Sequence, residues 1–372
     1  ILDLSPAGDQ PMVTRDGRFA LVFNGELYNF REIRATLEGS GIRFQSTGDA
    51  EVVLQALAHF GVRALESFNG MFALAFYDAR ERRLLLARDH AAIKPLYVLR
   101  HREGVLFASQ YDQILAHPWA RDHSIDEAAL SLYLNLGYLP PPVAMLAGSQ
   151  ALEAGSWLSF DASGSERQGR WFEFPRFREP DLRGHAALEA VDAAVTSAVR
   201  RQLVSDVPVG VFLSGGIDSP LVAAKAQAFL GPESPLPAFT LGTNGGAHDE
   251  SADAARYAEA LGIRHVVRHI TSDDIGLLDD VVGACGEPSD DYSIFPTALV
   301  SRLAREEVKV VLSGDGGDDV FWGYPGRMIG PLAPPGRSLG ARARGILRQV
   351  VGRSDGSTAP PARHTGATQL RL

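Results

Sequence analysis

The stretch "GVFLSGGIDSPLVAA", residues 210–224, joins a buried-strand pattern to a helical pattern through two adjacent glycines. It predicts a helix that starts at Pro220, because proline needs no N–H at the first helical position. Free amides and the helix dipole favour an anion at such a turn, and glycines let the backbone approach a ligand closely. The stretch therefore predicts an anion site; the alternative is a plain turn that Asp218 caps.

Helical and strand patterns alternate on both sides of this loop. The expected helices cover 186–204, 219–230 and 249–261, and the expected strands cover 207–213, 237–241 and 263–270. Alternation of this kind builds a parallel sheet with helices over its faces. We therefore expect an α/β fold in which the loop lies at the carboxyl end of a buried strand.

The chemistry of the loop follows from a residue that it lacks. The pattern G-x-x-x-x-G-K-[ST] would place a lysine against the β and γ phosphates, and this loop carries Asp218 instead. A carboxylate so close to phosphates would repel them unless a divalent cation lay between, so we infer Mg²⁺. Cleavage then falls between the α and β phosphates. The loop holds the departing pyrophosphate while a substrate carboxylate becomes an acyl-adenylate.

A second stretch, "VKVVLSGDGGDDVFWGY" at 308–324, repeats this design. An apolar strand pattern leads into a loop with Ser313, three glycines and three aspartates. Ligands of open parallel sheets bind outside the carboxyl ends of the strands, so we expect both loops to face one crevice. Asp218 and Asp318 would then share one metal ion. Taken alone, "GDGGDD" is also an acceptable exposed turn.

The region from Arg18 to about Phe160 has a different pattern, with short strand-like runs between turn signals. The runs "RFALVFNGELYN" and "GMFALAFYDARERRLLLARD" predict strands, and "DARE" at 78–81 could turn a hairpin. Residues 49–60 predict a helix with one apolar face. That face is expected to hold Val52, Val53, Ala56, Leu57 and Phe60.

Taken together, these motifs resemble a known family. S-G-G-x-D-S followed by L-S-G-D-G-G-D-[DE]-x-F-x-G-Y resembles the ATP pyrophosphatase domain of the glutamine-hydrolysing asparagine synthases. "NGELYNFREIR", "TGDAEVVL", "FNGMFALAFYD" and "RDHAAIKPLY" resemble that family's class II glutamine amidotransferase domain. The resemblance covers residues 1 to about 326. It implies an N-terminal Ntn-type αββα sandwich followed by a parallel-sheet ATP pyrophosphatase domain of the adenine nucleotide α-hydrolase type.

The resemblance also implies roles for individual residues. Asn24 and Gly25 would form an oxyanion hole, and Glu26 and Asp49 would bind the α-amino group of L-glutamine, so that all four residues contact glutamine. The expected ATP and pyrophosphate contacts are Leu213, Ser214, Gly215, Gly216, Asp218, Ser219, Leu241, Ser313 and Gly314. Asp315 would lie near the reacting carboxylate, and Asp218 and Asp318 would bind Mg²⁺.

The implied reaction is the amidation of L-aspartate through β-aspartyl-AMP, with ammonia from glutamine. Two related reactions stay open: amidation of another carboxylate on a polysaccharide sugar or peptide, and a reaction like that of β-lactam synthetase. A degenerate paralogue that binds without turnover is the non-enzyme alternative. The family's N-terminal cysteine nucleophile and downstream lysine are not in this sequence, so we expect a fragment that lacks both ends and is itself inactive as a glutaminase.

Composition and length set the remaining expectations. The chain has 372 residues and a net charge of −9, which argues against a nucleic-acid partner. No apolar run approaches a membrane span, and the single cysteine, Cys285, excludes an internal disulfide, so we expect a cytoplasmic protein that could form a homodimer. The expected parts are an amidotransferase domain 1–165, a linker 166–184, a synthetase domain 185–330 and an arginine-rich tail 331–372.

Overall fold

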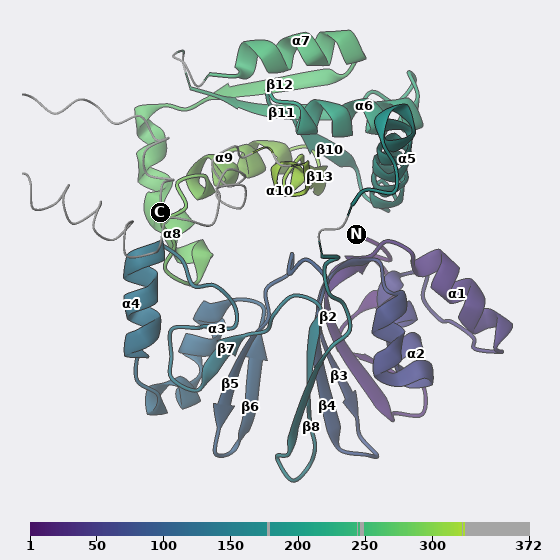
Figure 1. The fold of residues 1–372 in the computed structure, drawn as a ribbon, viewed down its shortest axis with the longest axis vertical. Helices are drawn as coiled ribbons and strands as arrows, with labels where there is room; N and C mark the ends of the chain where they lie inside the picture. Colours follow the sequence, from purple (N-terminus) through teal and green to yellow (C-terminus); the bar gives the residue numbers. More distant parts are fainter. Residues whose placement is uncertain (177–178, 244, 246–248, 322, 324–372) are drawn as a thin grey trace, which may run out of the picture. The chain divides into compact units, whose positions relative to one another are not determined.

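The computed structural model describes residues 1–176, 179–243, 245, 249–321 and 323 (Figure 1). The chain forms two compact units, Ile1–Ser313 and Gly314–Leu372, and the first holds most of the described elements. The predicted tail 331–372 lies outside the described residues. Among the helices that are described, none is long and apolar enough to cross a membrane.

The N-terminal part of the first unit contains two antiparallel sheets. The larger sheet has the order β1-β2-β3-β4-β8-β9 and the smaller has the order β6-β5-β7. The strands of the larger sheet are β1 (Met12–Val13), β2 (Phe19–Leu27), β3 (Gly70–Asp78), β4 (Arg83–Arg88), β8 (Ser156–Phe160) and β9 (Glu166–Arg170). Those of the smaller sheet are β5 (Tyr97–His101), β6 (Gly104–Ala108) and β7 (Ser149–Ala151).

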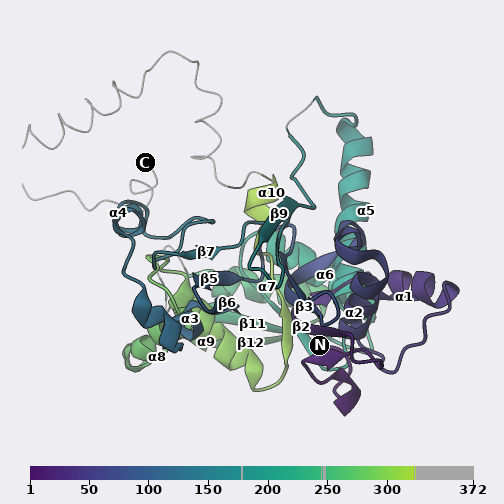
Figure 2. The same cartoon turned by 90° about the horizontal axis from the view of Figure 1, so that it is seen from below.

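Helices cover the outer faces of these two packed sheets. Helices α1 (Phe30–Gly39) and α2 (Asp49–Phe60) lie side by side and pack on the larger sheet (Figures 1 and 2). Helix α3 (Tyr111–Ala116) packs on the smaller sheet. Between the sheets, residues such as Leu86 and Val98 share one apolar core. The predicted αββα sandwich is therefore confirmed.

The bounds of helix α2 agree with the predicted helix 49–60, and four of its five predicted face residues are buried. The prediction for Phe60 is wrong, because its side chain is 41% exposed. Phe60 is the last residue of the helix, and the chain turns at Gly61, where φ is 62°. Periodicity cannot show where a helix leaves the sheet that it covers. The remaining short helices of this part are η1 (Pro6–Gly8), η2 (Gly61–Ser67), η3 (Pro118–Asp122) and α4 (Glu127–Leu136).

The first unit continues into a parallel sheet of order β12-β11-β10-β13, as the alternating pattern predicted. Its strands are β10 (Val209–Phe212), β11 (Pro237–Gly242), β12 (Arg264–His269) and β13 (Val310–Leu312). Helices α5 (Gly184–Gln202), α6 (Asp218–Leu230) and α7 (Ser251–Leu261) share one core with the sheet. Helix α9 (Ile294–Arg305) packs on the sheet through a separate core around Phe239, and η4 (Ser272–Leu277) and α8 (Leu278–Cys285) precede it.

Two element boundaries differ from the expectations. Helix α6 begins at Asp218 and not at Pro220, which is its third residue and still lies in the first turn, where an amide is not needed. Residues 166–170, expected in the linker, form β9 and pair with β8. This strand carries polar, mostly exposed side chains, so it lacks the apolar alternation that marks a strand in a sequence. The other predicted domain boundaries stay predictions.

Candidate functional site

The first group of predicted site residues lies on one strand. Asn24, Gly25 and Glu26 belong to β2, and Gly25 lies opposite Phe72 of β3. A Cβ atom at position 25 would lie 2.7 Å from Phe72 Cα, which is closer than real Cβ contacts. A glycine is therefore required here by the approach of β3. The Asn24 side chain lies on an exposed position of the strand.

Asp49, the first residue of α2, comes to the same place from a different element. Its side chain is 6% exposed, and its Oδ2 accepts a hydrogen bond of 2.7 Å from Leu27 N, at the end of β2. Burial raises the pKa of Asp49 from 3.8 to about 6, and the nearby negative charge of Glu26 raises it further, whereas the bond from Leu27 N lowers it. The α2 N-terminus thus presents a buried carboxyl group.

These residues surround a small cavity of about 160 Å³. Gly25, Glu26 and Asp49 line it, as do Gly48 and Ser46 before the helix, whereas Asn24 is not among the lining residues. The α-ammonium group of Ile1 lies 3.1 Å from Glu26 Oε1. Glu26 and Asp49 thus bring two carboxyl groups to one small cavity.

Three residues that the sequence did not single out hold this cavity together. Glu51 is 6% exposed, and its carboxylate accepts bonds from Gln45 N and from both the amide and the hydroxyl of Ser46. Arg34 donates to Ser46 O at 2.8 Å and to Gly48 O at 3.3 Å. Gln10 exchanges two bonds with the backbone of Phe23. Arg34 and Glu51 lie within the quoted motifs, but only the structure shows that they fix the loop before Asp49.

The loop after β10 has the features of an anion site. Ser214 N donates to Ser219 Oγ at 2.9 Å, and the hydroxyl groups of these two serines are also 2.9 Å apart. Gly216 N donates to Ser214 Oγ at 3.3 Å. These bonds fold the loop over the first turn of α6, where the amides and the helix dipole favour negative charge. Asp218 is the first residue of that turn.

An acidic residue from another element binds this loop. Gly215 N donates to Glu250 Oε2 at 3.0 Å, and Glu250 directly precedes α7. The carboxylate oxygen of Glu250 thus occupies the position of an anion at the loop, and its chemistry is close to that of a phosphate oxygen. Glu250 was not predicted from the sequence. The signal that could have found it is its place after β11, because the carboxyl ends of β10 and β11 lie at the same edge of the sheet.

The two leucines predicted at the nucleotide lie at this edge as well. Leu213 is 3% exposed and follows β10, and its N–H donates to Phe239 O of β11 at 3.0 Å. Leu241 belongs to β11 and is half-buried. The hydroxyl of Thr240 ties the same two strands, because it donates to Leu213 O at 2.6 Å. The structure thus gathers Leu213, Leu241 and the first glycine loop at one end of neighbouring strands.

The second loop belongs to both units. Ser313 ends the first, and Gly314 begins the second, in which Gly317 N donates to Gly314 O at 3.1 Å. Helix α10 (Gly317–Phe321) carries Asp318 in its first turn. The roles of Asp315 and Asp318, and the sharing of a metal ion with Asp218, stay predictions.

Across the described residues 1–176, 179–243, 245, 249–321 and 323, no group of three or more His, Cys, Asp or Glu could hold a metal ion. Magnesium that is bound beside a nucleotide does not require such a group of protein ligands. Mg²⁺ usually takes one or two carboxylates together with phosphate oxygens and water. The carboxylate of Asp218 beside an anion-binding loop fits that requirement.

Comparison with known proteins matches both parts of the chain. A family described as "Glutamine amidotransferase domain" matches residues 1–172, and one described as "Asparagine synthase" matches residues 190–358. A Mycobacterium tuberculosis (strain ATCC 25618 / H37Rv) protein, provisionally named a glutamine-hydrolysing asparagine synthetase, is 35% identical over 314 residues. Those residues are 82% of this chain and 48% of that protein. The chain belongs to the glutamine-hydrolysing asparagine synthetase family.

Two further curated relatives show similar coverage. "Asparagine synthetase [glutamine-hydrolyzing] 1" of Bacillus subtilis (strain 168) is 32% identical over 87% of this chain and 50% of its own length. "Amidase chry2" of Gibberella zeae is 29% identical over 94% of this chain and 54% of its own length. The chain thus spans about half the length of the curated asparagine synthetase relatives that it matches. The amidotransferase match extends to residue 172 and so includes β9.

Proposed function

We propose that this chain forms the glutamine site and the adenylating site of an ATP-dependent amidotransferase. The observation that carries the proposal is the bond between Gly215 N and the carboxylate of Glu250, because it supports an anion-binding role for the first glycine loop. The cavity between Glu26 and Asp49 supports the glutamine role. The products would be an amide, glutamate, AMP and pyrophosphate.

At the glutamine site, Glu26 and Asp49 bind the α-ammonium group of L-glutamine. Two carboxylates around a cavity of about 160 Å³ suit one ammonium group, and both must be ionised to attract it. Asn24 and Gly25 donate hydrogen bonds to the oxygen that becomes negative when the glutamine amide is attacked. The pairing of β2 with β3 positions the backbone that carries these two residues.

At the adenylating site, the loop from Ser214 to Ser219 holds the β and γ phosphates of ATP. Magnesium, held by Asp218 and Asp318, would offset the charge of the phosphate oxygens when bound. Glu250 leaves Gly215 N when a phosphate oxygen takes its place. Ser313 and Gly314 contact AMP, Leu241 contacts the adenine, and Asp315 lies near the carboxylate that becomes adenylated.

We propose L-aspartate as the acceptor, with β-aspartyl-AMP as the intermediate. The names of the asparagine synthetase relatives support this acceptor. A relative named as an amidase supports a second candidate, in which the same sites serve a different carboxylate, for example on a sugar or peptide. A cyclising reaction like that of β-lactam synthetase and binding without turnover are two more candidates that the same sites could support. A cytoplasmic location and a homodimer remain part of the proposal.

The test is pyrophosphate release by the intact gene product with ATP, Mg²⁺ and ammonia, with and without aspartate. We expect release that requires aspartate. Asp218→Asn should abolish it, whereas Glu233→Gln, which removes an exposed charge after α6, should leave it unchanged. Release that is independent of aspartate would point to a different carboxylate. No release under either condition would refute L-aspartate as the acceptor.

A further inference from the structure

A cavity of about 330 Å³ lies in the amidotransferase part, apart from the glutamine cavity and from the glycine loops. The residues that decide its chemistry are Arg18, Phe19, Phe76, Arg83, Trp157 and Arg167. It shares no lining residue with the cavity around Asp49. Nothing in the proposed amidotransferase function uses it.

The register of the larger sheet explains why these side chains gather on one face. One row across the strands runs from Phe19 through Asp78 to Arg83, and the next runs from Phe76 through Leu85 and Ser159 to Arg167. Strand residues two apart point to the same face. The face that these rows share is the one that α2 covers, because Phe76 and Leu85 belong to the core with Leu57.

Helix α2 covers only part of this face. It ends at Phe60, and Gly61 turns the chain away with a φ of 62°. Leu57 and Ala58 in the last turn form one edge of the cavity, together with Gly61 and Val62. The cavity lies where the helix stops, and aromatic rings form part of its floor: Phe19 and Phe76 stack with centroids 5.3 Å apart, and the Arg18 guanidinium lies 4.5 Å from the Phe19 ring centroid.

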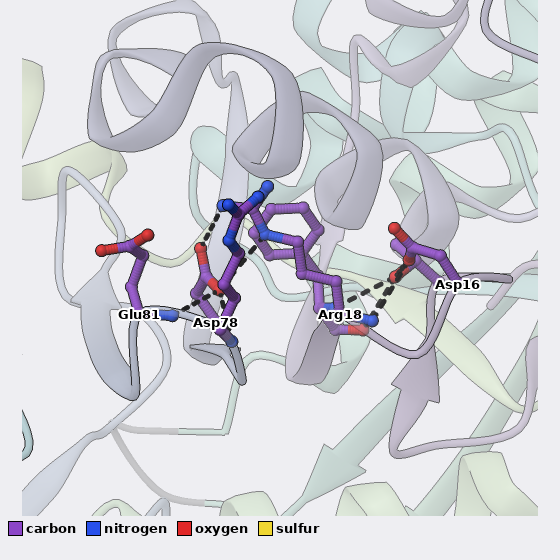
Figure 3. Close-up of polar contacts among 7 residues, drawn as sticks. Asp16, Arg18, Asp78 and Glu81 are labelled. Carbon is purple, nitrogen blue, oxygen red and sulfur yellow. Dashed lines mark hydrogen bonds and ion pairs between the residues drawn. The ribbon is translucent and has the colours of Figure 1, made fainter.

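The three arginines at the rim of the cavity differ in whether a carboxylate binds them. Arg18 is held by Asp78 through bonds of 2.8 and 3.3 Å, and its backbone amide donates to Asp16 (Figure 3). The hydrogen bonds from the Arg18 guanidinium lower the pKa of Asp78. Arg83 and Arg167 are exposed, and within the part of the chain that the structure describes neither side chain forms an ion pair or hydrogen bond.

The lining also carries a second acid, Glu81. It lies at the rim beside Asp78, and its backbone amide donates to Asp78 Oδ1 at 3.1 Å (Figure 3). With three arginines and two carboxylates, the lining keeps one net positive charge. The guanidinium groups of Arg83 and Arg167 come from β4 and β9, on the far side of the cavity floor from β2.

The geometry points to a binding site for a small planar aromatic anion, whose ring lies against Trp157 and the exposed edges of Phe19 and Phe76 and whose acidic group meets Arg83 and Arg167. A volume of about 330 Å³ is at the lower end of small-molecule sites. Guanidinium groups bind carboxylate or phosphate oxygens in pairs, and aromatic floors favour a flat ligand. Neither the aromatic rings nor the arginines alone would indicate an aromatic anion as the ligand. The register of the sheet places both kinds of side chain in one cavity.

The site is separate from the glutamine cavity. Asn24 is five positions beyond Phe19 on β2, which corresponds to roughly 17 Å along a strand. Both places are built on β2 and α2, with Asp49 at the first end of the helix and Leu57 at the last turn. The inference does not depend on the proposed function, since binding can be measured without turnover.

The test is calorimetric titration of the full chain with naphthalene-2,6-dicarboxylate, an aromatic dianion, and with the neutral naphthalene-2,6-dimethanol. We expect saturable binding of the dianion and at least tenfold weaker binding by the double variant Arg83→Gln/Arg167→Gln. The neutral compound should bind both proteins equally weakly. Quenching of Trp157 fluorescence, lost in Trp157→Phe, locates the ligand on the cavity floor.

The matched control is Arg15→Gln/Arg121→Gln, which removes two exposed arginines that do not line the cavity. It should bind the dianion like the original chain. All four substitutions are at exposed positions, so circular dichroism is expected to show unchanged folding. Absence of saturable binding, or equal affinity of both double variants, would overturn the inference.

Discussion

Replacing Asp49 by asparagine should stabilise the fold and weaken glutamine binding. The carboxyl group is 6% exposed, and its pKa is raised to about 6, chiefly by burial. The folded chain therefore holds a proton at Asp49 over a pH range in which the unfolded chain, with a pKa near 3.8, has lost it. Stability from this group is present below pH 3.8 and is lost as the pH rises through 6.

The magnitude follows from the shift. A change of about 2 pKa units costs roughly 3 kcal/mol once Asp49 is ionised in both states, and roughly 1 kcal/mol at pH 4.5, where the folded chain is still protonated. Asparagine cannot ionise, and its amide oxygen can still accept from Leu27 N. We therefore expect Asp49→Asn to raise the free energy of unfolding by about 3 kcal/mol at pH 7.5 and by about 1 kcal/mol at pH 4.5.

Urea unfolding at both pH values would measure this difference through tryptophan fluorescence. Trp119, Trp157 and Trp171 are three of the four tryptophans, and all lie in the amidotransferase part. The control Asp9→Asn changes an exposed carboxylate and should give no such difference. The Leu27 amide signal in NMR should titrate near pH 6. A variant that is no more stable than the original chain at pH 7.5, or a Leu27 midpoint near pH 4, would refute the reasoning.

Three further predictions concern the two sites. Asn24→Ala should lower glutamine-dependent synthesis by the intact gene product about 100-fold or more and spare ammonia-dependent synthesis; equal loss of both would contradict the oxyanion role. Glu250→Ala should tighten calorimetric binding of metal-free pyrophosphate about fivefold, because it frees Gly215 N, and weaker binding would contradict competition at that amide. Glu51→Gln should lower the free energy of unfolding by about 2 kcal/mol in urea, since its amide cannot accept every bond that the carboxylate does, and an unchanged midpoint would argue against this role.

The sequence predicted the parallel sheet well because local patterns determine it. Buried parallel strands are short apolar runs, and the helices between them have an apolar face, so each element is visible without knowledge of its neighbours. β9 was missed for the opposite reason. Glu166–Arg170 has no apolar face, and only its backbone pairing with β8 makes it a strand. The prediction for Phe60 was wrong because the point at which a helix stops covering the sheet depends on how the whole layer of helices packs.

The candidate sites were predictable to a different extent. Gly25, Glu26 and Asp49 were placed by a family pattern, and the structure brings all three to one cavity. Glu250 was not found, because its contact with Gly215 depends on how the segment before α7 returns to the sheet edge. No short pattern encodes such a return. Placing an acidic residue there requires the strand order, which the sequence does not state directly.

The first turn of α2 shows why two neighbouring acids have different consequences. Asp49 and Glu51 are both buried, and burial raises the pKa of Asp49 to about 6. Glu51 receives bonds from two backbone amides and a hydroxyl, whereas Asp49 receives one bond from another element, Leu27 N. A buried carboxylate without a full set of donors destabilises a fold, so its place is better explained by a ligand than by structure. An ammonium ligand would supply the missing donors and favour the ionised carboxyl group. The ionised carboxyl group of Asp49 destabilises the fold of the free chain, and this cost is itself an argument for the glutamine site.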